Sequence, residues 1–123
     1  MNGIHGILLI LTGMIHIVYG LLPHTYLHDW QKFFIAGLWD TVSTNNDKGM
    51  AAFWFIIAGL LMLLVGLAIF EIEKLKSVLP LSIGIAFFAI TALGCIMAPK
   101  SGFTLFLLPQ SIFYFYSSLK NRA

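Results

Sequence analysis

The chain has 123 residues, of which 59% are hydrophobic and only 10% are charged. This composition lies outside the range of soluble domains and predicts a protein embedded in a lipid bilayer. The net charge of +2 is too small to indicate a nucleic-acid partner, and a single cysteine excludes a disulfide within the chain. We therefore expect one all-α integral membrane domain that covers residues 1–123.

Four apolar segments approach the roughly 20 residues that a helix needs to cross a hydrocarbon core of about 30 Å. They cover residues 2–22, 49–70, 79–98 and 102–119, and none of them contains Asp, Glu, Lys or Arg. The first has no basic region before its apolar run, so we expect it to be retained as a helix and not cleaved as a signal peptide. The pattern predicts a four-helix transmembrane bundle.

The first segment, GIHGILLILTGMIHIVYG, carries its polar residues on one side. At about 100° per residue, four side chains fall within about 60° of one another: His5, Thr12, His16 and Tyr19. Because polar groups are costly in lipid, we expect this stripe to face protein.

Small residues spaced by sevens mark both the first and the second segments. They are Gly6, Gly13 and Gly20 in the first, and Ala52, Gly59 and Gly66 in the second. A stripe of small residues lets a neighbouring helix approach closely. The two segments are therefore predicted to pack tightly as an antiparallel pair.

Residues 23–48 form the longest stretch outside the four spans. Apolar residues recur there at helical spacing: Leu27, Trp30, Phe34, Leu38 and Trp39. The spacing predicts a short amphipathic helix in the membrane interface, with its tryptophans at headgroup depth.

His24 and His28 in this loop are four residues apart, so a helix would place both imidazoles on one face, as zinc or copper ligands would be. No third ligand of matching geometry accompanies them. We favour solvated interfacial histidines and expect no metal.

Two features shape the remaining spans. Pro109 lies inside the fourth segment, where it removes a backbone hydrogen bond and predicts a kink. The sequence EIEKLK, with Glu71 and Glu73, is expected to form a solvated turn between the second and third spans.

The distribution of basic residues indicates the topology. The side that holds both termini and residues 71–78 has four (Lys74, Lys76, Lys120 and Arg122), and the other side has three (Lys32, Lys48 and Lys100). The positive-inside rule then favours both termini in the cytoplasm, with the amphipathic loop outside.

Depth within the bundle suggests a binding site in the outer leaflet. His16 and Tyr19 lie about 9 Å and 4.5 Å below Leu22 at 1.5 Å per residue, and the loop could cover them as a lid. The predicted ligand-binding residues are His16, Tyr19, Thr12, Trp39, Asp40, Trp54 and Gln110. The expected ligand is a hydrophobic or amphipathic small molecule, such as a lipid or a quinone.

Several alternatives stay open. His16 could simply bond to a neighbouring helix. Haem held by both His5 and His16 is excluded, because eleven residues separate them by about 16 Å along the axis; haem bound through His16 alone stays an alternative. An accessory subunit or scaffold could use the glycine stripes to bind a membrane protein or a second copy of the chain. A small enzyme that uses His16 is less favoured, because no catalytic motif is present. A transporter is also less favoured, because the four spans lack the acidic residue that proton-coupled pumps usually have.

The marked first segment, the Trp-containing loop and the opening AAFWFIIAGLLMLLVG of the second segment together resemble small bacterial four-helix membrane proteins of the DoxX-like type. The resemblance implies a multi-pass protein of the bacterial cytoplasmic (inner) membrane. Some DoxX-type proteins are associated with respiratory or thiol-redox partners, so it also implies a quinone or redox-accessory role.

Overall fold

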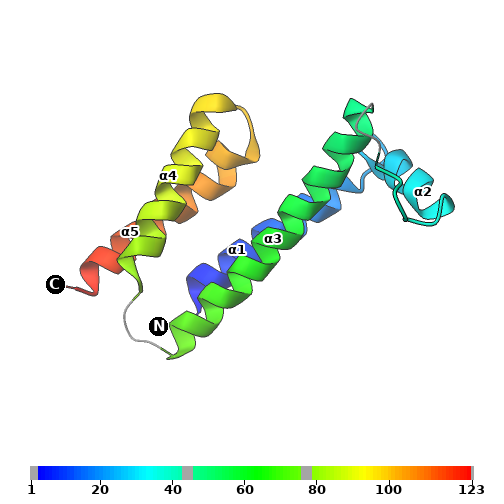
Figure 1. The fold of residues 1–123 in the computed structure, drawn as a ribbon. Coiled ribbons are helices and arrows are strands. Elements are labelled where there is room, and N and C mark those ends of the chain that lie inside the picture. The colour runs from blue at the N-terminus through cyan, green and yellow to red at the C-terminus, as the bar shows by residue number, and fades with distance from the viewer. Residues whose placement is uncertain (1–2, 43–45, 76–78, 123) are drawn as a thin grey trace.

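The computed structural model describes residues 3–42, 46–75 and 79–122, and all regular structure in these ranges is helical. The prediction of an all-α fold is confirmed. Figure 1 shows the elements in chain order: α1 (Ile4–Gly20), α2 (Leu27–Ile35), α3 (Asp47–Leu75), α4 (Leu81–Met97), the π-helical turn η1 (Phe103–Leu107) and α5 (Leu108–Lys120).

Helices α1 and α3 form a close antiparallel pair (Figure 1). A Cβ atom added to Gly13 would lie 3.0 Å from the carbonyl oxygen of Gly59, and one added to Gly66 would lie 2.8 Å from the amide nitrogen of Ile10. These distances leave almost no room for a side chain, so the two backbones nearly touch. The predicted pairing through small residues is confirmed.

Helices α4 and α5 lie together on one side of this pair (Figure 1). Helix α4 packs against η1 and α5, and η1 and α5 in turn contact α1. The helices therefore follow one another in space in the order α3, α1, α5, α4. The buried core lies where the hairpin of α1 and α3 meets the hairpin of α4 and α5, and it consists of Leu9, Ile69, Leu79 and Tyr114. Both chain ends lie at one end of the molecule, and α2 lies at the other end (Figure 1).

Helix α3 is longer than the sequence predicts, because it begins at Asp47 and continues to Leu75. Its 29 residues correspond to about 43 Å at 1.5 Å per residue. Among the described helices, α3 is the one long and apolar enough to cross a membrane. The apolar helices α1 and α4 are shorter, with 17 residues each.

The fourth predicted span is divided near Pro109. The π-helical turn η1 ends at Leu107, and α5 begins at Leu108 with the proline in its first turn. Pro109 has no N–H to offer the carbonyl of Leu105, and its ring crowds that carbonyl. A π-helical turn is wider than an α-helical turn and accommodates the missing hydrogen bond and the proline ring. The α-helix is therefore interrupted just before Pro109.

The predicted loop helix is present as α2, and one face of it packs against α3. Asp29 and Phe33 are buried and Phe34 is exposed. The phenyl ring of Phe33 lies beside Gly49 at the start of α3. Because α2 ends at Ile35, Leu38 and Trp39 of the predicted pattern lie beyond the helix.

The side chain of Trp30 forms a hydrogen bond between α2 and α3. The indole Nε1 of Trp30 donates a hydrogen bond to the carbonyl oxygen of Ala52 at 3.2 Å. We expect Trp30→Phe to weaken this attachment by about 1 kcal/mol and to speed cleavage of the loop by an added protease. Trp39→Phe is the matched control, because Trp39 is 91% exposed. Equal cleavage of the two variants would contradict this role of Trp30.

Candidate functional site

Two of the predicted site residues, Thr12 and Gln110, meet between α1 and α5. The hydroxyl of Thr12 donates to the carbonyl oxygen of Leu8 at 2.8 Å. The same hydroxyl accepts a hydrogen bond from Nε2 of Gln110 at 2.5 Å. Since Thr12 is buried, this contact forms a polar link between the two hairpins.

His16 lies one turn beyond Thr12 on the same side of α1. Its imidazole stacks on the phenyl ring of Phe55 from α3, with ring centroids 3.9 Å apart and planes inclined by 12°. Its Nε2 is buried and has no hydrogen-bond partner, and neither has Oε1 of Gln110. A buried polar atom without a partner costs about 1–3 kcal/mol. These two atoms are therefore still able to form hydrogen bonds with another molecule.

A shallow apolar groove of about 440 Å³ runs along the C-terminal half of α1. Its lining residues are Leu11, Met14, Ile15, Val18, Tyr19 and Leu22. At about 100° per residue, Ile15 and Tyr19 adjoin Thr12 and His16 on the helix surface. The groove therefore borders the polar stripe, and the tyrosine ring stands at the boundary between them.

The other predicted site residues lie elsewhere. Trp39 and Asp40 line a separate hollow beside α2, because residues 36–42 follow α2 and do not cross over α1. Trp54 is 59% exposed and contacts the ring of Phe53. The expectation of one covered pocket that holds all seven residues is therefore not met. Their predicted part in ligand binding stays a prediction.

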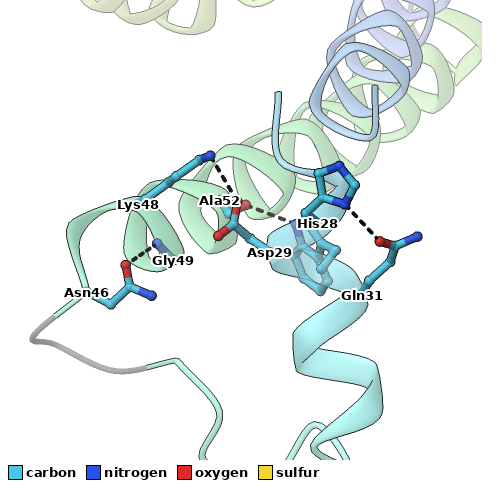
Figure 2. Close-up of polar contacts among 8 residues, drawn as sticks. His28, Asp29, Gln31, Asn46, Lys48, Gly49 and Ala52 are labelled. Carbon is cyan, nitrogen blue, oxygen red and sulfur yellow. Dashed lines mark hydrogen bonds and ion pairs between the residues drawn. The ribbon is translucent and has the colours of Figure 1, made fainter. Parts of the chain in front are cut away.

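The two loop histidines do not share a helical face. His24 precedes the start of α2, and its ring makes an edge contact with Tyr19. His28 lies in α2, where its Nδ1 is 3.1 Å from Oε1 of Gln31 (Figure 2). Within the described ranges, no three residues of the His, Cys, Asp and Glu types are grouped so that they could hold a metal ion.

A buried carboxylate lies at the opposite end of α1. Glu73, from the last turns of α3, is 2% exposed. Its Oε1 accepts a hydrogen bond from the backbone N–H of His5 at 3.3 Å, and its Oε2 accepts one from Gly6 at 3.0 Å. Gly3 precedes the helix and has no side chain to do this. Glu73 therefore caps α1 from another helix, where its charge also favours the positive end of the helix dipole.

The expectation of a solvated turn at residues 71–78 is thus wrong for Glu73, although Glu71 is exposed. Helix α3 continues to Leu75, so Glu73 faces α1 while Glu71 does not; residues 76–78 lie outside the described ranges. A signal was present in the sequence: Glu73 continues the seven-residue spacing of Gly59 and Gly66. The neighbouring charged residues of EIEKLK indicated a solvated turn instead.

His5 lies at the same end of α1 and is buried between helices. Its ring centroid lies 4.4 Å from that of Phe113 and 5.2 Å from that of Tyr114, both on α5. The hydroxyl of Tyr114 is buried and has no hydrogen-bond partner, as is also true of the Thr91 hydroxyl on α4. His5 therefore has a packing role between the two hairpins.

Comparison with known proteins gives one match. The model of a family of unknown function, DUF6463, matches residues 2–120. No curated protein and no solved structure matches the chain significantly. Because the matched range includes every helix described above, the chain belongs to the DUF6463 family.

Proposed function

We propose that this protein is a four-helix protein of the bacterial cytoplasmic membrane that binds one small amphipathic molecule between α1 and α5. Large apolar side chains on the outer surfaces of α3 and α4 support the membrane location, because in water they would form an unfavourable surface. They include Leu60, Leu61, Leu64, Ile90, Leu93 and Ile96. Both termini lie at one end, as the proposed cytoplasmic side requires (Figure 1).

The binding proposal depends on two atoms, His16 Nε2 and Gln110 Oε1. Both are buried without a hydrogen-bond partner, and they come from helices joined through Thr12. A ligand with hydroxyl groups could accept a hydrogen bond from the imidazole and donate one to the amide oxygen. Pairing either atom in this way would remove the cost of leaving it unpaired.

The surroundings of these atoms favour a ligand with a neutral head group and an apolar body. The segments of α1 and α5 around Thr12 and Gln110 contain no acidic or basic side chain that could balance a charged head group. The groove along Ile15 and Tyr19 could receive an apolar chain beside the polar stripe. A quinol or a lipid with a hydroxyl group has this chemistry. Of the ligands expected from the sequence, a lipid therefore fits directly, whereas a quinone fits only in its reduced form, because a quinone has no O–H group to donate.

We expect His16→Phe and Gln110→Leu each to reduce ligand retention about tenfold, because each removes one hydrogen-bonding group worth about 1.4 kcal/mol. Phe at position 16 can still stack on Phe55, so helix packing should be preserved. The measurement is mass spectrometry of small molecules that remain bound after purification in native lipid. His28→Phe, at an exposed position of α2, is the matched control.

A hydroxyl-bearing molecule present in the control but depleted in both variants would support the proposal. Retention of the same molecules, in equal amounts, by the unmodified protein and by both variants would exclude binding at His16 and Gln110.

The alternative function, as an accessory subunit, requires the glycine stripes to be free to bind a partner. The glycines of both stripes are buried, and they contact atoms of the partner helix within the same chain. They are therefore not available to an external partner, and a partner or second copy would have to bind through another face.

A further inference from the structure

The end of the molecule that carries α2 has a second hollow, distinct from the groove on α1. Its volume is about 360 Å³. It is lined by α2, by the residues that follow α2 and by one residue before α3: Asp29, Lys32, Phe33, Ala36, Trp39, Asp40, Thr41 and Asn46. In the proposed orientation this hollow lies at the level of the outer lipid head groups.

Asp29 is the buried charged residue of the hollow. It is 7% exposed, and its Oδ2 has no hydrogen-bond partner. The ammonium group of Lys48 lies 3.9 Å from this oxygen (Figure 2), beyond the roughly 2.7–3.2 Å of a hydrogen bond. The Lys48 side chain is mostly exposed, so water screens much of its charge. Among the described residues, Oδ2 of Asp29 therefore has no N–H donor at hydrogen-bond distance.

The other lining residues are complementary to a group that carries both charges. Asp40 adds a second carboxylate, and Lys32 adds a cation on the same wall as Asp29, one turn further along α2. The indole of Trp39 is almost fully exposed and can cover the face of a bound cation. Acidic, basic and aromatic groups are thus placed around one hollow.

We infer that this hollow binds the head group of an aminophospholipid, with the primary ammonium on Asp29 and the phosphate on Lys32. A primary ammonium supplies the N–H donor that Oδ2 of Asp29 lacks. A trimethylammonium head group has no N–H, and a glycerol head group has no positive charge for the two carboxylates. The site is independent of the molecule proposed to bind at His16.

The experiment uses the full chain purified in detergent and incubated with equal amounts of three phospholipids that have identical acyl chains. Their head groups are phosphoethanolamine, phosphocholine and phosphoglycerol, and native mass spectrometry counts the bound lipids. We expect phosphatidylethanolamine to be bound at least fivefold more often than either of the others. We also expect soluble O-phosphoethanolamine to compete with it, which would show that the head group is recognised.

Asp29→Asn and Trp39→Ala should each abolish most of this preference. Trp39 is exposed, so its removal tests the site even if Asp29→Asn fails to fold. Glu71→Gln, an exposed acidic residue at the other end of α3, is the control and should keep the preference. Equal binding of the three lipids, or an unchanged preference in Trp39→Ala, would overturn the inference.

The two proposed sites can fail separately. His16→Phe and Gln110→Leu should leave the preference for phosphatidylethanolamine unchanged, because they do not line this hollow. A loss of preference in those variants would assign the bound lipid to the space between α1 and α5 and would overturn the assignment to Asp29.

Discussion

Glu73→Ala is expected to lower the free energy of unfolding by about 3 kcal/mol, because it leaves two buried backbone N–H groups without an acceptor. Those groups belong to His5 and Gly6, in the first turn of α1, and Glu73 accepts from both. The substitution also removes a negative charge from the positive end of the helix dipole. Reversible denaturation in mixed detergent micelles, followed by circular dichroism, measures the difference.

Two further variants identify the cause. Glu71→Ala changes an exposed carboxylate on the same turns of α3 and should alter stability by less than about 0.5 kcal/mol. Glu73→Gln keeps one acceptor oxygen and should fall between the two. If Glu73→Ala were as stable as Glu71→Ala, the capping role of Glu73 would be wrong.

Gly6→Ala should have an effect of similar size, about 3 kcal/mol, because it overpacks the contact between α1 and α3. A Cβ atom at this position would lie 2.5 Å from the amide nitrogen of Phe70 and 2.6 Å from its Cα. These are backbone atoms, so no side-chain rotation can relieve the collision and the helices must separate. The separation would also stretch the hydrogen bond from Gly6 to Glu73.

The same substitution at Gly102 serves as the control, because its nearest non-neighbouring heavy atom would be 3.7 Å from the added carbon. Gly102→Ala should leave the unfolding free energy within about 0.5 kcal/mol of the unmodified value. If the free energy of unfolding of Gly6→Ala equalled that of Gly102→Ala, α1 and α3 would not be in close backbone contact.

The α1–α3 pairing was predictable because close helix packing leaves a periodic trace in each chain segment. Gly13 and Gly59 could be recognised from spacing alone, since each belongs to a seven-residue series of small residues. The all-helical character followed from apolar length for a similar reason. Both properties are local or repeat along the chain.

The candidate site was predicted only in part. Thr12 and Gln110 were both named from their polarity inside apolar segments, and the structure brings them into contact. Trp39 and Asp40 were placed over His16 by an argument from depth, which gives the level of a residue but not its lateral position. Their position depends on where α2 ends and which way the chain then turns, and composition does not determine either.

Glu73 was missed because a charged residue near a predicted turn is usually solvated. Its burial follows from one fact that is not local: α3 continues far enough to bring Glu73 to the first residues of α1. The partners are 67 and 68 positions apart in sequence. A spacing argument carried past the apolar run would have reached it.

The same separation has a consequence for biosynthesis. Because translation proceeds from the N-terminus, α1 leaves the ribosome long before Glu73 has been made. The first turn of α1 must therefore rely on temporary acceptors, such as water, until the end of α3 has been made. The final positioning of α1 against α3 is thus one of the later steps in assembly, although α1 is synthesised before α3.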